Sequence, residues 1–410
     1  MKLDPRREVW MSADKTRAVL AALGGTARFV GGAVRNALLR REVTEVDIAT
    51  PLTPDEVTKC LQGAGLGAVP TGIEHGTVTA ISSGTPYEVT TLRRDVASDG
   101  RHAIVAFTTD WKEDAQRRDF TMNALYADAE GEVFDFVGGV ADLQAGRVRF
   151  VGDATTRIRE DYLRILRLFR FHAWYGKGEI DSAALHAAAA QKAGLAQLSG
   201  ERVQKEMLRL LAAEEPAPVL RTMAATGILG EVLPGALAIA RLERLAAIDA
   251  GAFFTPDPLL RLAALLPDDA TVAAAVATKL RLSNAQAERL SAIAGRKEKI
   301  VSYLSVKEVR KLLYRIGPQA FKDRVFLKWA EDPKESNAVQ WRMLLAVADA
   351  WERPVFPLSG REVMLAGVPE GPLVGRILAE VEDWWIDADF IDDQFSLAER
   401  LKAVVQATAY

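Results

Sequence analysis

Two acidic residues, Glu45 and Asp47, stand two positions apart in the run EVDIAT. On a strand, residues two apart point to the same side, so both carboxylates can face one cavity. Hard divalent cations prefer such oxygen ligands, and two-metal phosphoryl transfer needs carboxylates close together. Acidic pairs on strands are also common on solvated surfaces. The residues that precede this pair favour the catalytic interpretation.

A pair of glycines precedes the acidic pair. Gly31 and Gly32 follow the run ARFV, and Arg35 lies in the helix-compatible stretch behind them. Glycines between a strand and a helix let backbone amides approach an anion, the helix start adds partial positive charge, and an arginine can fork onto phosphate oxygens. A Gly-Gly pair alone is equally a tight turn. Followed by the acidic pair, it predicts a grip on a triphosphate.

Three further residues are candidates for the same site. Glu88 is the one charge in the run YEVTT, and it is either a third metal carboxylate or an outward residue of an edge strand. In the run RRDF, Arg118 can bind phosphate or ribose oxygens, and Asp119 can accept a hydrogen bond from a ribose hydroxyl. The alternative for these two neighbours is a surface salt bridge of little energetic value.

The segment RIREDYLRILRLFRF, residues 157–171, combines charge with helical spacing. Asp161 and Arg164 lie three apart, and Arg164, Arg167 and Arg170 repeat at intervals of three, so on a helix they form one polar stripe. Apolar packing surface comes from Leu163, Ile165, Leu166 and Phe169. The alternative is a solvated helix face with local ion pairs.

A carboxylate beside a guanidinium can also read a base, because together they present an acceptor and a donor in one plane. Cytosine and adenine both display an amino donor next to a ring-nitrogen acceptor, whereas uracil and guanine display a carbonyl in place of the amino group. Asp161 and Arg164 would therefore accept C or A. With U or G two acceptors would face each other, at a cost of about 1–3 kcal/mol.

Composition limits the class of protein. The chain has 410 residues with 49% hydrophobic and 26% charged residues, which indicates an ordinary globular protein of two or three compact units. The net charge of −3 means that any nucleic-acid contact must come from a local basic face. The single cysteine, Cys60, excludes an internal disulfide, fits a reducing cytoplasm and is expected to be a small buried residue. No window is apolar enough to span a bilayer, and four histidines without a metal-binding spacing argue against a zinc site.

The elements that must position these residues change class midway along the chain. The first 150 residues alternate β-type runs with helical stretches and predict one mixed sheet. The expected strands are residues 27–30, 46–49, 77–81, 87–91, 104–108 and 148–151. The remainder predicts amphipathic helices, at residues 183–193, 201–213, 218–226, 259–265, 284–294 and 306–316. Proline and glycine concentrate at residues 352–375, which predicts a linker before a small last module.

Five blocks in this order resemble the class II nucleotidyltransferases, most closely the bacterial CCA-adding tRNA nucleotidyltransferases. The blocks are FVGGAVRNALL, EVDIAT, RRDFTMNAL, FVGGVADL and REDYLRILRLFRF, and the resemblance continues through LSGERVQKEM and weakly near PLSGREVMLAGVPEGPLVG. It implies an α+β fold with a mixed-sheet head (1–150) followed by an all-α neck with the base template (151–215), an RNA-binding body (216–350) and a tRNA-binding tail (351–410).

The resemblance also implies roles for individual residues. The acidic pair, Glu45 and Asp47, would be catalytic and bind Mg²⁺, with Glu88 as a further metal ligand. Nucleotide contacts would come from Gly31, Gly32, Arg35, Arg118, Asp119, Asp161, Arg164, Arg167 and Arg170. Two residues depart from the family pattern, because Glu45 and Asn36 stand where aspartates are usual. The extra methylene of Glu45 moves its carboxylate by about 1.5 Å, and Asn36 lacks a charge that could orient Arg35.

The function that these observations predict is template-independent addition of C and A to the 3′ end of tRNA from CTP and ATP, with release of pyrophosphate. Neither a membrane nor DNA is an expected partner. A poly(A) polymerase or an enzyme that adds only A is the alternative within the class. A noncatalytic RNA-binding protein on the same scaffold is the alternative outside it, and Glu45 is the observation that motivates it.

Overall fold

The computed structural model divides the chain into two compact units, Met1–Pro234 and Gly235–Tyr410. It describes residues 1–98, 103–235, 237–252, 254–295, 298–391 and 393–408, with backbone only for 95–98 and 103–105. All the candidate site residues lie in the first unit. The predicted division into head, neck, body and tail is finer than these two units and stays a prediction.

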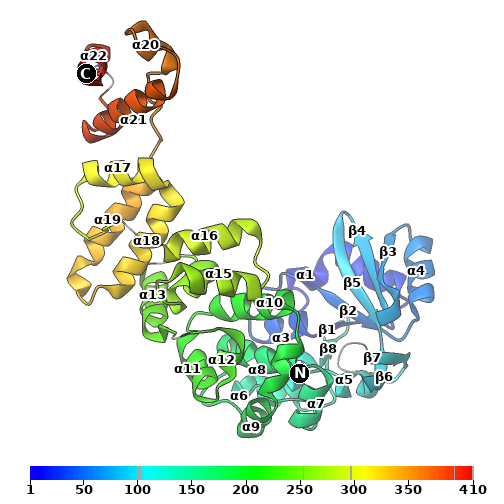
Figure 1. The fold of residues 1–410 in the computed structure, drawn as a ribbon. Helices are drawn as coiled ribbons and strands as arrows, with labels where there is room; N and C mark the ends of the chain where they lie inside the picture. The colour runs from blue at the N-terminus through cyan, green and yellow to red at the C-terminus, as the bar shows by residue number, and fades with distance from the viewer. Residues whose placement is uncertain (99–102, 236, 253, 296–297, 392, 409–410) are drawn as a thin grey trace. The chain divides into compact units, whose positions relative to one another are not determined.

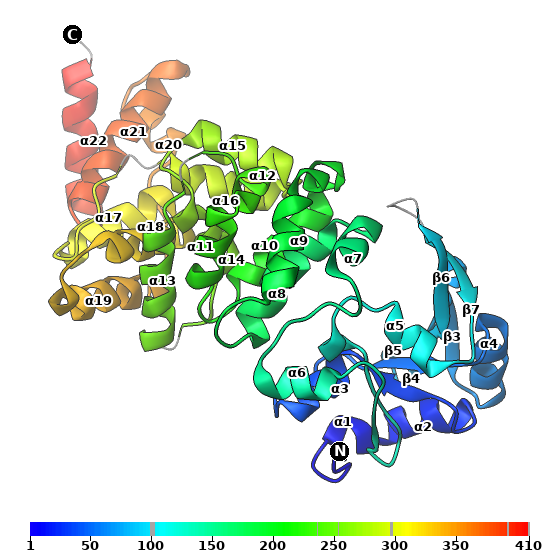
Figure 2. The same ribbon diagram turned by 90° about the horizontal axis from the view of Figure 1, so that it is seen from below.

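The first unit contains a seven-stranded mixed sheet of order β3-β4-β5-β2-β1-β8-β9, in which α4 packs beside β3 (Figure 1). Only β2 and β5 run parallel, and β6 and β7 form a separate antiparallel pair (Figure 2). The strands are β1 (Arg28–Val30), β2 (Asp47–Thr50), β3 (Gly67–Gly72), β4 (Thr77–Ser82), β5 (Thr85–Thr91), β6 (Arg93–Ser98), β7 (Ala103–Phe107), β8 (Leu125–Ala127) and β9 (Val133–Asp135).

The strand register forms one row of residues across this sheet. Asp47 of β2 is paired with Glu88 of β5 on one side and with Val30 of β1 on the other, and Val30 is paired with Tyr126 of β8. Side chains of directly paired residues point to the same face of a sheet. The row therefore places Asp47, Glu88 and the Tyr126 ring on one face.

Five of the six predicted strands are confirmed, and the sixth is wrong. Residues 148–151 form no strand, and only the bridge between Phe120 and Phe150 joins them to another segment. Val148, Phe150 and Val151 are buried, so this run is apolar because it packs in the core, which periodicity cannot distinguish from a buried strand. Both edge strands of the seven-stranded sheet, β3 and β9, were not expected. β3 contains glycine and proline, which edge strands tolerate.

Helices complete the first unit. They are α1 (Val9–Ser12), α2 (Asp14–Ala22), α3 (Gly32–Leu38), α4 (Pro54–Gly63), α5 (Trp111–Gln116), α6 (Gly139–Ala145), α7 (Ala154–Glu160), α8 (Leu163–Tyr175), α9 (Ser182–Ala190), α10 (Gly200–Leu211), α11 (Ala217–Ala225) and α12 (Ile228–Val232), with short 3₁₀ turns η1 (Ile73–His75), η2 (Thr121–Asn123) and η3 (Lys192–Gln197). Cys60 of α4 is a free thiol and is partly exposed, so the expectation of full burial is wrong.

The segment that predicts one charged helix is two helices in the structure. α7 ends at Glu160 and α8 begins at Leu163, because Asp161 has extended backbone angles (φ −157°, ψ 107°). The Asp161 carboxylate accepts a hydrogen bond from the Leu163 backbone N–H at 3.1 Å. Aspartate commonly satisfies free N–H groups at a helix start in this way. The carboxylate therefore lies at a helix junction and not within a continuous stripe.

Among the residues that the structure describes, the regular elements of the second unit are all helices. Its elements are α13 (Ile239–Ala252), α14 (Pro258–Leu265), α15 (Ala270–Lys279), α16 (Asn284–Ala294), α17 (Val306–Ile316), α18 (Pro318–Glu331), η4 (Glu335–Asn337), α19 (Ala338–Asp349), α20 (Gly360–Leu365), α21 (Pro372–Asp387) and α22 (Gln394–Thr408). Ser283, Ser305 and Ser359 each begin a helix with a capping box. The predicted linker is shorter than expected, because α20 and the start of α21 lie within residues 352–375.

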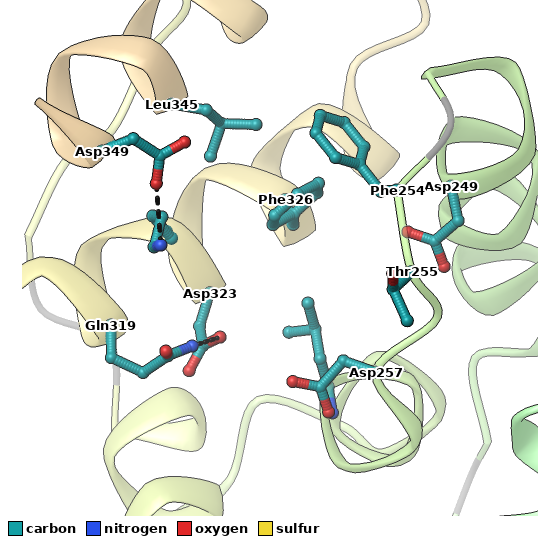
Figure 3. Close-up of a pocket in the computed structure, with 11 residues that line it drawn as sticks. Asp249, Phe254, Thr255, Asp257, Gln319, Asp323, Phe326, Leu345 and Asp349 are labelled. Atoms are coloured by element: carbon teal, nitrogen blue, oxygen red, sulfur yellow. Dashed lines mark hydrogen bonds and ion pairs between the residues drawn. The ribbon is translucent and has the colours of Figure 1, made fainter.

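Ion pairs surround a pocket of about 220 Å³ in the second unit (Figure 3). The aspartates that line this pocket have basic partners: Asp249 pairs with Arg261, Asp257 and Asp323 with Arg289, and Asp349 with Lys322. The Asp249–Arg261 contact measures 2.9 Å, and its side chains are 7% and 1% exposed. A charge buried this deeply is tolerated only with a close partner.

Asp249→Ala should therefore reduce the free energy of unfolding by about 3–5 kcal/mol, because it removes a close anionic partner of the buried Arg261 guanidinium. Urea denaturation followed by far-ultraviolet circular dichroism measures this change. Asp383→Ala is the matched control, because Asp383 pairs with Arg315 at the surface and its side chain is 67% exposed. A loss for Asp249→Ala no larger than that of the control would contradict the prediction.

Candidate active site

The glycine turn after β1 has a backbone that requires glycine. Gly31 has φ +68° and ψ −119°, and its N–H donates to the Leu125 carbonyl at 3.0 Å. A Cβ at Gly31 would lie 3.9 Å from Nη1 of Arg118. L-residues rarely adopt this backbone conformation. The turn therefore brings bare backbone close to the Arg118 guanidinium, in line with the prediction that both serve one site.

Two neighbouring carboxylates act on Asp47 at the start of β2. Burial, then the charges of Glu88 and Glu45, raise the pKa of Asp47 to about 6, while Arg118 opposes the rise. Glu88 lies directly beside Asp47 in register, so the two residues share one face of the sheet, and the role of Glu88 as a metal ligand stays a prediction. Glu45 lies in the loop before β2 and not on the strand as expected. The sheet thus concentrates negative charge where a cation would be stabilised.

A buried clamp orients Arg118. Its Nε donates to Asp114 and to the Tyr126 hydroxyl, both at 3.1 Å, and its Nη2 donates to Asp114 at 2.9 Å. The Tyr126 hydroxyl donates to the same carboxylate at 2.6 Å. Burial alone would raise the pKa of Asp114, but the charges of Arg118 and Arg117 outweigh it and lower the pKa to about 2. Asp114 is therefore an ionised anchor for Arg118.

Asp119 is occupied by protein partners. Its carboxylate accepts from Arg167 Nε at 2.8 Å, from the Phe120 N–H at 2.8 Å and from Asn123 at 3.1 Å. Burial would raise its pKa, but the charge of Arg167 and these hydrogen bonds lower it to about 2. In this structure Asp119 joins the segment between α5 and η2 to α8, which is a different contact from the neighbour salt bridge considered as its alternative.

Arg35 is buried among uncharged partners. Its guanidinium donates to Asn123 at 2.5 Å, to the Tyr175 hydroxyl at 2.8 Å and to Asn36 Oδ1 at 3.0 and 3.2 Å. The Tyr175 hydroxyl also donates to Asn36, whose own amide donates to the Glu42 carbonyl at 2.9 Å. Asn36 therefore orients Arg35 without the charge of the usual aspartate, and Arg35 keeps its full positive charge uncompensated by these contacts.

The two residues predicted to read the base are held by different partners. Asp161 accepts from Arg202 Nη2 of α10 at 2.7 Å. Arg164 donates to the Glu160 carboxylate and, at 2.8 Å, to the Arg157 carbonyl. The prediction that Asp161 and Arg164 lie side by side on one helix face is wrong, because the helix is interrupted at Asp161, between α7 and α8.

Arg167 and Arg170 lie on α8 as predicted and meet one carboxylate of α10. Glu206 accepts from Arg170 Nε at 2.5 Å and lies 3.7 Å from Arg167. Arg170 and Glu206 are both buried. The apolar residues predicted for this helix, Leu163, Ile165, Leu166 and Phe169, are buried too.

Several site residues were not predicted from the sequence, namely Asp114, Asn123, Tyr126, Arg202 and Glu206. One sequence signal was available for Glu206, because it interrupts an apolar helix face formed by Val203, Met207 and Leu210. A charge at such a position indicates a buried partner. The other four residues carry no comparable signal in the sequence.

Carboxylate oxygens are the donors that this site offers to a metal. Among the described residues, no three His, Cys, Asp or Glu side chains converge as a metal site. The pair Glu45 and Asp47 fits Mg²⁺ nonetheless, because Mg²⁺ is usually bound by one or two carboxylates together with water and substrate phosphates. Across all the residues that the structure describes, no helix is long and apolar enough to cross a membrane.

Family models match two parts of the chain. Residues 27–149 match the poly(A) polymerase head domain, and residues 179–239 match the "probable RNA and SrmB- binding site of polymerase A". Together with the glycine turn, the acidic strand and the clamped arginine, these matches define a nucleotidyltransferase.

Similar proteins narrow this class. The chain is 34% identical over 394 residues to the mitochondrial CCA tRNA nucleotidyltransferase 1 of Mus musculus, covering 92% of this chain and 86% of the relative. It is 31% identical to the CCA-adding enzyme of Levilactobacillus brevis, covering 93% and 95%. The crystal structure of the Bacillus stearothermophilus CCA-adding enzyme in complex with CTP superposes with a TM-score of 0.78 at 26% identity, over 100% of this chain and 98% of the other. The chain belongs to the family of CCA-adding tRNA nucleotidyltransferases.

In the metal-free protein, Asp47 should titrate with a midpoint near pH 6. Because the folded state then holds a proton that the unfolded state has lost, the free energy of unfolding should decrease as pH rises from about 4 to 6. Glu88→Gln should lower the midpoint, since it removes the neighbouring negative charge. Carbon-13 NMR of the Asp47 carboxyl measures both values. Glu130→Gln, in the turn between β8 and β9, is the control, and a wild-type midpoint near 4 would contradict the prediction.

Proposed function

We propose that this protein adds C and A nucleotides to the 3′ end of tRNA, using CTP and ATP and releasing pyrophosphate. The observation that carries the proposal is the row across the sheet. It places Asp47 and Glu88 on one face with the Tyr126 ring, whose hydroxyl holds Arg118, beside the glycine turn. Negative charge for metals and positive charge for phosphates thus meet at one place, as phosphoryl transfer requires.

In the reaction, the tRNA 3′ oxygen forms a bond to the α-phosphorus and the bond to the β-phosphate bridging oxygen breaks. Glu45 and Asp47 are the residues that would hold Mg²⁺, and Glu88 is proposed as a weaker third ligand. Bound Mg²⁺ would activate the hydroxyl and neutralise charge on the leaving group. Gly31, Gly32 and Arg118 would contact the triphosphate or ribose, and the uncompensated charge of Arg35 would act on the same phosphates.

We propose that Asp161 and Arg164 select the base. Arg167 and Arg170 would contribute positive charge for the base and phosphates. Arg167 joins Asp119 to Glu206, so the base-reading helix α8 is tied both to the segment that follows α5 and to α10. This tie would keep the distance between the base and the metals constant. The head, neck, body and tail boundaries at residues 150, 215 and 350 are part of the proposal, as is a cytoplasmic location.

Purified protein incubated with tRNA lacking its CCA tail should incorporate C from CTP and A from ATP, but not U or G, in a divalent-cation-dependent way. Asp47→Ala should lower the rate by at least ~100-fold, because metals and nucleotide lose their common ligand. Labelled nucleotide incorporation measures both results. Incorporation of A alone would support the A-only alternative. No binding of CTP with Mg²⁺ would support a noncatalytic RNA-binding protein, and full activity of Glu45→Ala would remove Glu45 from the mechanism.

The later helices should bind tRNA through its backbone and shape, because one enzyme of this type must accept many tRNAs. Arg281→Glu and Arg376→Glu reverse exposed charges in the second unit. They should weaken tRNA binding, with a smaller salt dependence than the wild type, and leave CTP binding unchanged. Filter binding across a salt series measures this. Unchanged tRNA affinity at low salt in both variants would exclude these residues from the RNA interface.

A further inference from the structure

The residues proposed to read the base have partners whose role the proposed function does not include. If Asp161 and Arg164 formed an ion pair with each other, neither group would be available to a base. In the structure, Asp161 instead forms an ion pair with Arg202, and Arg164 forms an ion pair with Glu160. Arg202 comes from α10, 41 positions along the chain from Asp161. Asp161 is therefore held by a tertiary contact and Arg164 by a local one, so the two base-reading groups are paired elsewhere.

We propose that Arg202 is a positioning residue that sets nucleotide selectivity by fixing the Asp161 carboxylate. This inference rests on the proposed function, since it assumes that Asp161 reads the base. Arg202 itself need not touch the nucleotide. Its contribution is to hold one oxygen of Asp161 so that the carboxylate presents a constant acceptor next to Arg164.

The hydrogen bonds of Asp161 leave room for a base. Its Oδ1 accepts from the Leu163 N–H at 3.1 Å and its Oδ2 accepts from Arg202 Nη2 at 2.7 Å. A carboxylate has about four acceptor positions, two on each oxygen. Each oxygen thus keeps one position, which an amino group of cytosine or adenine can occupy. The two contacts come from different elements, one from the start of α8 and one from α10. Together they restrict rotation of the carboxylate.

Loss of Arg202 would release this restriction. Oδ2 would have no partner from α10, and electrostatic attraction could turn the carboxylate toward the guanidinium of Arg164. Rejection of U and G depends on a fixed acceptor facing their carbonyl oxygen, whereas a carboxylate that can turn away avoids this repulsion. Selectivity should therefore fall together with the rate of C addition.

The Asp161–Arg202 pair is exposed enough that removing Arg202 should not unfold the protein. The Arg202 side chain is 43% exposed and that of Asp161 is 28% exposed. Ion pairs at this exposure contribute little to the free energy of folding. A variant that lacks Arg202 should stay folded, so a change in nucleotide choice can be attributed to the site.

The experiment measures kcat/KM for CTP and for UTP separately, using the full chain and tRNA that lacks its tail. Arg202→Ala should lower kcat/KM for CTP by about tenfold and reduce the ratio of CTP to UTP by a similar factor, the effect expected for one charged hydrogen bond. Arg202→Lys should give an intermediate ratio, because an ammonium restores the charge without the planar guanidinium geometry. The melting temperature should be unchanged in both.

Lys205→Ala is the matched control, because Lys205 is an exposed basic residue one turn further along the same helix. It should leave the CTP to UTP ratio within about twofold of the wild type. The double variant Asp161→Ala/Arg202→Ala should lose no more selectivity than Asp161→Ala alone, since Arg202 acts through Asp161.

Two results would overturn the inference. The first is an unchanged ratio in Arg202→Ala. The second is a raised KM for tRNA in Arg202→Ala and Lys205→Ala alike with normal nucleotide choice, which would make Arg202 an RNA phosphate contact. Either result leaves the proposed function intact. The proposed function fails separately, through a wild-type protein that incorporates neither C nor A.

Discussion

Guanidinium groups buried beside an anionic substrate site need partners, and this constraint shapes the first unit. A charge removed from water is stable only when hydrogen bonds and opposite charges replace its hydration. Arg118 is held by Asp114 and Tyr126, and Arg167 by Asp119. Because each pairing is geometrically specific, it determines where the remaining N–H groups of these arginines point, and so where a phosphate or base can be bound.

These pairings also connect elements that lie far apart in the sequence. Asp119 follows α5 and meets α8, Glu206 of α10 meets Arg170 of α8, and Arg35 of α3 meets Tyr175 at the end of α8. The glycine turn that would bind phosphates and the helix that would read the base are therefore parts of one hydrogen-bonded framework. Such a framework favours a constant separation between the reacting phosphorus and the base-reading groups, which transfer chemistry requires.

The departures from the family pattern have local explanations. Asn36 supplies the same acceptor oxygen to Arg35 that a carboxylate would supply, and its amide adds a contact to the Glu42 carbonyl. The difference is one of charge, since Arg35 is no longer neutralised by its neighbour. Glu45 lies in the loop before β2 and not on the strand, and its charge still acts on the Asp47 carboxylate.

The sequence by itself determined the residue types, the order of the strand, turn and helix around Gly31, and the family. Periodicity predicted α9, α10, α11, α14, α16 and α17, because each buries one face regardless of its partner, whereas helices such as α13, α15, α18 and α19 were not predicted. The tertiary structure alone decided the partners of the charged groups, since Arg167 and Asp119 are 48 positions apart and Asp161 and Arg202 are 41 apart. It also decided the break at Asp161, where a side-chain contact to a backbone N–H ends one helix and starts the next. Local spacing cannot specify such pairings, because they depend on which elements the core brings together.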